Sequence, residues 1–215
     1  NMLFILTTGK SMKGKSMKKY NSVKHLGRIA LDFSKVDELI KNYKKTHIHH
    51  YLLKKEKHTL VDKSDASKEI DARIKAYRSQ GYNNYNTRFN QVFDQEHPDV
   101  FAPFAKESGL EKAVCGIITQ APGNVLPMHR DTFINFKTKN RILADVEVVR
   151  YMIFLEDWVP GHMFTVENES MDNWKKGDII YWGDAFHLGA NASSVTKSTM
   201  NITGIANPDC LHLRL

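Results

Sequence analysis

Short apolar runs, each bounded by turn residues, dominate the second half of this 215-residue chain. Valine, isoleucine, phenylalanine and tyrosine recur in these runs, and this composition favours strands over helices. Several short strands with turn signals between them are typical of a β-sandwich or a β-barrel. The expected strands cover residues 113–120, 146–155, 162–168, 178–183 and 197–205.

Helical patterns are expected only in the first half of the chain. A strand over Ile29–Phe33 is expected to lead into a helix over residues 34–44, with Ser34 as its cap. Apolar residues at helical spacing predict a second helix over residues 65–79. A proline opens a third, short helix over residues 98–106. The chain is therefore expected to be mainly β with N-terminal helices.

The triplet His129-Arg130-Asp131, followed far downstream by His187, is the candidate for chemistry. In an extended strand, residues i and i+2 point to the same side, so His129 and Asp131 can reach one ion. His187 is expected to arrive from a different strand. Two imidazoles and one carboxylate leave one face of a metal free and are typical of non-haem Fe(II) oxygenases. The triplet alone is a weak signal in a chain with 10 histidines, and a solvated loop is the competing interpretation.

The motifs around the triplet follow a definite order along residues 112–206: Gln120–Asp131, Arg150–Trp158, Pro160–Phe164, Trp174–Asp178, His187–Ser193 and Lys197–Gly204. This order resembles the Fe(II)/2-oxoglutarate-dependent dioxygenase superfamily, in particular its prolyl-hydroxylase and aspartyl/asparaginyl-hydroxylase-like branches. The resemblance lies in the order of the motifs, and no single motif is specific by itself.

The resemblance implies a double-stranded β-helix, the jelly roll of cupin-like proteins, with helices packed on one sheet. It implies that His129, Asp131 and His187 are the metal and catalytic residues. The expected enzyme is a hydroxylase that uses Fe(II), 2-oxoglutarate and O2, with ascorbate as an accessory reductant. Its expected substrate is an amino acid, a peptidyl residue or another small molecule, with release of succinate and CO2.

Three further residues are expected to bind the cosubstrate. Lys197 stands ten positions after His187, where the resemblance implies a basic residue for the far carboxylate of 2-oxoglutarate. Thr199 lies on the same face of the expected strand and can add a hydroxyl bond. Lysine replaces the commoner arginine here and lacks its two-pronged geometry. Arg150 is expected either to contact the cosubstrate or to form an ion pair on the surface.

A competing motif lies near the N-terminus. Residues Gly9–Ser16 match the phosphate-binding pattern G-x-x-x-x-G-K-[ST], in which Lys15 would reach the terminal phosphate. However, residues 9–13 and 14–18 are the same pentad in tandem, and this repeat produces the match without a phosphate site. A nucleotide-binding P-loop protein is therefore an alternative function. A second alternative is a cupin-like module that binds a metal without catalysis.

Charge and cysteine content bound the organisation of the chain. Residues 1–60 hold 14 lysines and arginines against 4 acidic residues, whereas the rest holds 17 against 20. We expect a flexible basic arm over residues 1–25, which can attract an acidic partner. An α/β support region over residues 26–111 and a catalytic core over residues 112–215 would form one integrated domain. The chain has only 2 cysteines and no expected signal or membrane span, so a cytoplasmic location is expected.

Substrate-selecting residues are expected on loops around the mouth of the barrel. The candidate loops are residues 80–95 and 132–145, which include Tyr82, Tyr85, Arg88 and Arg141.

Overall fold

The computed structural model of the chain describes residues 22–42, 48–50 and 65–214. Its helices are α1 (Ser34–Asn42), α2 (Asp65–Ser79), α3 (Pro98–Ser108), α4 (Ile134–Asn140) and α5 (Leu211–Arg214). Its first strands are β1 (Lys24–Arg28), β2 (Ile48–His50), β3 (Arg88–Phe93), β4 (Glu111–Gln120), β5 (Val125–His129) and β6 (Val148–Phe154). The remaining strands are β7 (His162–Val166), β8 (Glu169–Met171), β9 (Asp178–Tyr181), β10 (His187–Asn191) and β11 (Lys197–Ile205).

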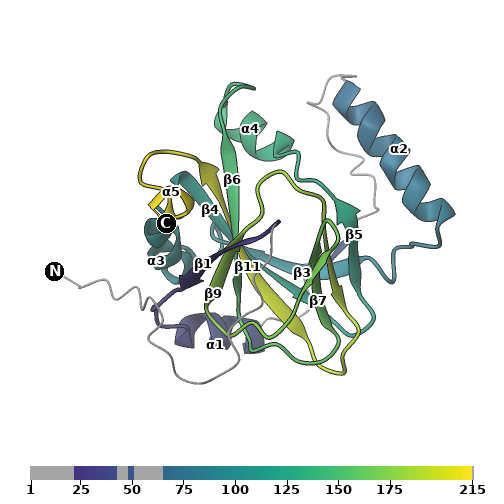
Figure 1. Cartoon of the computed structure of the whole chain (residues 1–215), viewed down its shortest axis with the longest axis horizontal. Coiled ribbons are helices and arrows are strands. Elements are labelled where there is room, and N and C mark those ends of the chain that lie inside the picture. The colour runs from purple at the N-terminus through teal and green to yellow at the C-terminus, as the bar shows by residue number, and fades with distance from the viewer. Residues whose placement is uncertain (1–21, 43–47, 51–64, 215) are drawn as a thin grey trace.

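The strands form two antiparallel sheets that face each other (Figure 1). The larger sheet has the order β1-β9-β6-β11-β4-β3-β2, and the smaller has the order β5-β10-β7-β8. From β4 to β11 the chain passes back and forth between the sheets, with the β7–β8 hairpin as the one local pairing. This alternation makes the fold a double-stranded β-helix, or jelly roll, and confirms the expected fold class.

The period-two alternation of strand residues decides which face of the larger sheet each side chain covers. On β6, Tyr151 and Ile153 point to an outer core, and Met152 and Phe154 point into the space between the sheets. Helices α1, α3 and α5 cover the outer face, where α3 contributes buried phenylalanines. Each fully buried side chain of this size contributes roughly 1.5–3 kcal/mol to folding. The outer core therefore fixes the larger sheet, whose inner face packs in part against side chains of the smaller sheet, such as Phe164.

All five strands predicted in the second half of the chain are present as β4, β6, β7, β9 and β11, with ends that shift by up to a few residues. The predicted helices are also present, and the second matches residues 65–79 at both ends. The first helix is described as far as Asn42, so residues 43–44 lie outside the described part of the chain. Helices α4 and α5 and strands β1, β2, β3 and β8 were not predicted.

Two predictions about the N-terminal region are wrong. Residues Ile29–Phe33 form no strand, because the ladder of β1 with β9 ends at the pair Arg28–Asp178, where β9 begins. Ser34 is not the cap of α1, because its backbone N–H and its hydroxyl both donate to the Asp32 carboxylate at 2.8 Å. The end of the predicted basic arm also differs, since residues 24–25 belong to β1. Residues 1–21 lie outside the described chain.

Over residues 22–42, 48–50 and 65–214, no helix is both long enough and apolar enough to span a bilayer.

Candidate metal centre

Two neighbouring strands of the smaller sheet bring the two histidines together. His129 is the last residue of β5, His187 is the first residue of β10, and the two are register partners in the antiparallel pair. The centroids of their rings lie 4.3 Å apart. The sheet itself therefore positions two of the three predicted ligands, as expected for a histidine that arrives from another strand.

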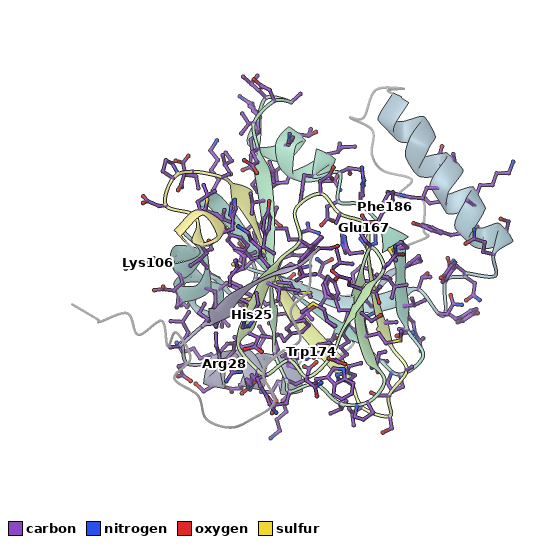
Figure 2. The ribbon with its side chains drawn as sticks, in the orientation of Figure 1. His25, Arg28, Lys106, Glu167, Trp174 and Phe186 are labelled. Atoms are coloured by element: carbon purple, nitrogen blue, oxygen red, sulfur yellow. The ribbon has the colours of Figure 1, made fainter. Side chains whose placement is uncertain are left out.

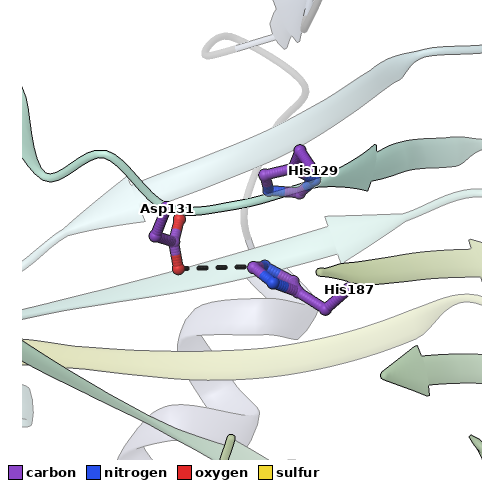
Figure 3. Close-up of side chains that lie close together, drawn as sticks. All are labelled: His129, Asp131 and His187. Atoms are coloured by element: carbon purple, nitrogen blue, oxygen red, sulfur yellow. Dashed lines mark ion pairs between the residues drawn. The ribbon is translucent and has the colours of Figure 1, made fainter. Parts of the chain in front are cut away.

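Asp131 lies in the same cluster but not on the strand. Strand β5 ends at His129, so Asp131 stands two residues into the loop that follows. Its Oδ2 nevertheless lies 3.8 Å from Nε2 of His187 (Figure 3). One ligand atom from each of the three residues lies within 4.8 Å of the others. The expectation that a continuous strand aligns Asp131 with His129 is wrong, and another contact must hold this carboxylate.

The polar atoms of the cluster fit a metal ion. Oδ2 of Asp131 is buried and has no hydrogen-bond partner, which is costly for a carboxylate oxygen unless a cation neutralises it. Nδ1 of His129 lies 2.6 Å from the Pro127 carbonyl oxygen, which only accepts, so Nδ1 donates and Nε2 keeps its lone pair. Two imidazole nitrogens and one carboxylate oxygen suit a divalent transition metal.

The surroundings of His187 affect its tautomer. Nδ1 of His187 accepts from the Trp182 indole N–H at 3.0 Å and also lies 3.2 Å from the Ala185 carbonyl oxygen. The bond from Trp182 requires a lone pair on Nδ1, so it favours the tautomer with its proton on Nε2. A metal on Nε2 requires the proton on Nδ1, and that proton then donates to Ala185. The neighbours of His187 thus include the acceptor that a metal-binding tautomer needs.

Burial and neighbouring charges favour the ligand forms of all three side chains. Burial, together with the nearby His187, lowers the pKa of His129 to about 4. Burial also lowers the pKa of His187. For Asp131, burial opposes ionisation, but the Arg150 guanidinium and the two imidazoles outweigh it and lower the pKa. At neutral pH the cluster therefore offers two neutral imidazoles and one carboxylate.

Arg150 contacts the candidate metal ligand. Its Nη1 donates to Oδ1 of Asp131 at 2.6 Å, and its Nε donates to Oγ1 of Thr203 at 2.9 Å. Arg150 also lines the cavity next to the cluster, so a contact with a cosubstrate stays a prediction. No sequence pattern indicated that Arg150 pairs with a residue of the metal cluster.

A cavity of about 70 Å³ lies between the sheets and joins the cluster to the other predicted residues. Its walls include both histidines, Arg150, Lys197 and Thr199. Phe164 and Trp182 form part of its apolar lining. Figure 2 labels Phe186, the residue before His187 in the chain, and shows it well apart from Trp174. All six residues predicted for metal and cosubstrate are therefore near one another.

Lys197 is a buried cation with spare hydrogen-bonding capacity. It is only 2% exposed, and its Nζ donates to the Met163 carbonyl at 2.7 Å and to Oε1 of Gln120 at 3.3 Å. No acidic side chain among the described residues forms an ion pair with it. Burial lowers the pKa of Lys197 to about 8, although Glu156 partly opposes this shift. An ammonium has three protons to donate, so one remains for a ligand.

Gly189 leaves room beside this ammonium. A Cβ added to Gly189 would lie 3.5 Å from Nζ of Lys197 and 3.5 Å from Oε1 of Gln120. Both distances are ordinary van der Waals contacts, so the protein itself would tolerate the extra atom. Gly189 thus lines the cavity next to Lys197, and any side chain at this position would contact the ammonium.

The buried ammonium predicts an unusual pH dependence of stability. The pKa of Lys197 is 10.5 in its ordinary state and about 8 here, so between these values the unfolded chain binds a proton that the folded protein lacks. Stability of the ligand-free protein therefore rises with pH across this window, by up to about 3 kcal/mol from this residue. The Lys197→Met variant lacks this gain. Urea unfolding at pH 7.5 and pH 10 measures the difference, and parallel pH profiles of the two proteins would contradict it.

Two contributing residues, Asn201 and Thr203, were not predicted. They alternate along β11 with the predicted Lys197 and Thr199, and the structure places Asn201 on the cavity and Thr203 against Arg150. Period-two spacing of polar residues in an otherwise apolar strand was the available signal. His162 begins β7, inside the predicted strand over residues 162–168, and is 2% exposed.

Other candidates stay predictions. The P-loop match over residues 9–16 lies outside the described part of the chain. Tyr82, Tyr85 and Arg88 lie in or beside the turn that precedes β3, and Tyr85 is 80% exposed. Arg141 follows α4 directly. Their predicted contact with substrate is untested.

Comparison with known protein families finds no matching family, and no curated protein matches either. Among solved structures, the chain is similar to a cupin 2 conserved barrel domain protein from Salinispora arenicola (12% identity, 54% of this chain, 75% of that chain, TM-score 0.34). It is similar to a predicted oxalate decarboxylase from Thermotoga maritima (10% identity, 55% and 82%, TM-score 0.35). It is also similar to the non-heme alpha-ketoglutarate-dependent carbocyclase SnoK from nogalamycin biosynthesis (11% identity, 78% and 83%, TM-score 0.44). At these identities, no ligand or activity is transferred to this chain.

Proposed function

We propose that this protein is a non-haem Fe(II)- and 2-oxoglutarate-dependent oxygenase of the hydroxylase type. One observation carries the proposal: the cluster of His129, Asp131 and His187 and the buried ammonium of Lys197 open onto the same cavity. A metal site next to an anion site is what an enzyme needs to bind a keto acid at both ends.

The three clustered residues would hold the metal through one atom each and leave its remaining positions free. When bound, iron(II) supplies the redox chemistry, in which 2-oxoglutarate and O2 are consumed and succinate, CO2 and a hydroxylated substrate are released. The chain contributes the neutral state of both imidazoles and the ionised state of Asp131. It also contributes a site in which Phe164 and Trp182 limit access of water.

The far carboxylate of 2-oxoglutarate would bind the Lys197 ammonium. Gln120 holds Nζ of Lys197 from one side, and its own amide nitrogen donates to the Gly189 carbonyl at 2.9 Å. The hydroxyl of Thr199 lines the same cavity and can donate to the second carboxylate oxygen. A charge-assisted bond in a water-poor cavity is stronger than the same bond in water.

The substrate would be an amino acid, a peptidyl residue or another small molecule that enters past residues 80–95 and 132–145. The basic residues near the N-terminus would attract an acidic partner. Ascorbate would be an accessory reductant, and the protein would act in the cytoplasm. A cupin-like module that only binds a metal is the second candidate, since the same cluster would serve it. A P-loop protein is the third candidate and depends on residues 9–16.

The deciding measurement is succinate formation from 2-oxoglutarate with Fe(II), ascorbate and air, without a prime substrate. We expect slow turnover in the wild type and none in His129→Ala, because that variant loses a ligand atom of the cluster. Lys15→Ala is the matched control and should form succinate like the wild type. If the protein instead depended on a nucleotide bound at the P-loop, Lys15→Ala would abolish its nucleotide-dependent activity. Anaerobic titrations of metal and 2-oxoglutarate accompany the assay. Metal binding without 2-oxoglutarate binding would favour the non-catalytic module.

A further inference from the structure

Asp131 needs support from outside its own strand. It lies in the loop beyond β5, where no ladder hydrogen bonds fix the backbone. Among the described residues, the hydrogen bond to its carboxylate comes from Arg150 on β6, in the larger sheet. A hydrogen bond at 2.6 Å thus joins β6 of the larger sheet to the loop after β5 at the candidate metal site.

The Arg150 guanidinium is itself held from two further directions. Its Nε donates to the hydroxyl of Thr203 on β11, at 2.9 Å. Its Cζ lies 5.2 Å from the centre of the Phe133 ring, which is within the range of a cation–π contact. Thr203 is only 7% exposed and lies behind Arg150 as seen from the cluster, so it can affect the cluster through Arg150.

Phe133 shows that the loop is shaped for this contact. It precedes α4 with a φ of 53°, a left-handed conformation that is unfavourable for an aromatic residue. Strain of this kind persists where the surroundings require it and is often found at functional sites. In this conformation Phe133, two residues after Asp131, packs its ring on the Arg150 guanidinium.

These contacts give the two carboxylate oxygens of Asp131 different roles. Oδ1 accepts from Arg150, whereas Oδ2 is buried without a partner and faces His187. We propose that Arg150 is a positioning residue of the metal centre: held by Thr203 and Phe133, it occupies Oδ1 and leaves Oδ2 as the one carboxylate ligand. The inference rests on the metal site of the proposed function, and it differs from a role of Arg150 in cosubstrate binding.

The test uses Co(II) binding to the metal-free protein, without 2-oxoglutarate and without O2. Thr203→Val removes the hydroxyl at constant shape and charge, and Thr203→Ser, which keeps the hydroxyl, is its matched control. We expect Thr203→Val to weaken Co(II) binding roughly tenfold and to change the visible absorption of the bound ion, whereas Thr203→Ser equals the wild type. Arg150→Lys keeps the charge but lacks the rigid fork that directs separate nitrogens at Asp131 and Thr203, and we expect a loss of roughly 10–100-fold.

Two results would overturn the inference. The first is wild-type Co(II) affinity and absorption in both Thr203→Val and Arg150→Lys. The second is wild-type Co(II) affinity in Arg150→Lys together with a large loss of 2-oxoglutarate affinity, which would make Arg150 a cosubstrate ligand. If Arg150→Lys does not fold, the two Thr203 variants decide alone. A wild type that binds Co(II) but forms no succinate would refute the oxygenase function and leave this test valid.

Discussion

Asp131→Ala is expected to abolish tight metal binding and, with it, succinate formation. The substitution removes the single anionic ligand of the cluster and leaves two neutral imidazoles. It also leaves the Arg150 guanidinium without its partner, so that a cation instead of an ion pair faces an incoming dication. Residues behind metal ligands contribute 10–100-fold to affinity, so we expect the loss of a ligand itself to exceed about 100-fold.

Anaerobic calorimetric titration of the metal-free protein with Fe(II) or Mn(II) measures this loss. Asp184→Ala is the matched control, because Asp184 lies beside the site in contact with Arg130 but is highly exposed. It should bind metal like the wild type. Wild-type affinity or turnover in Asp131→Ala would refute the metal centre.

The strand pattern made the histidines of this centre predictable. His129 closes one apolar run and His187 opens another after a turn, and antiparallel pairing of these runs places the two rings side by side. The same pattern misplaced Asp131, because periodicity says which way a strand residue points and not where the strand ends. The carboxylate still reaches the cluster, held by a guanidinium that is 19 positions away in the chain.

The failure at Ile29–Phe33 has a related cause. Ile29, Leu31 and Phe33 alternate as in a strand, and all three pack against the outer core. Their pattern therefore identified the buried side chains correctly. It could not show that β9, the partner of β1 among the described strands, has four residues and ends the ladder at Arg28. Apolar periodicity reports burial, whereas a strand also requires a neighbour of sufficient length.

The partners of Arg150 could not be predicted from the sequence for a similar reason. Its bond to Thr203 joins residues 53 positions apart, and the position of Phe133 depends on a left-handed turn that no local residue pattern announced. The family resemblance indicated Lys197 as an anchor through its spacing to His187, and this role stays a prediction. Its burial and its lack of an ion pair among the described residues required the arrangement of both sheets.

Lys197→Met is expected to weaken 2-oxoglutarate binding roughly 10–100-fold while metal affinity stays unchanged. Hydrogen bonds to charged groups contribute about 1.5–3 kcal/mol, and each 1.4 kcal/mol corresponds to about tenfold in affinity. Methionine keeps the length of the side chain in its buried position but offers no proton to the ligand. Lys175→Met is the control, because that lysine is exposed and paired with Asp157. Anaerobic calorimetry with 2-oxoglutarate on the Mn(II)-loaded protein measures both variants.

Gly189→Val tests the same anchor without removing any polar group. Its added Cβ would lie 3.5 Å from Nζ of Lys197, in space that a bound carboxylate needs, and its methyl groups would reach further into the cavity. A loss of 2-oxoglutarate affinity in both Gly189→Val and Lys197→Met, with metal binding intact, would locate the cosubstrate at this end of the cavity. Unchanged affinity in both variants would exclude Lys197 as the anchor. Because Arg150 is the other cation on the cavity, it would then be the residue to test for the cosubstrate carboxylate.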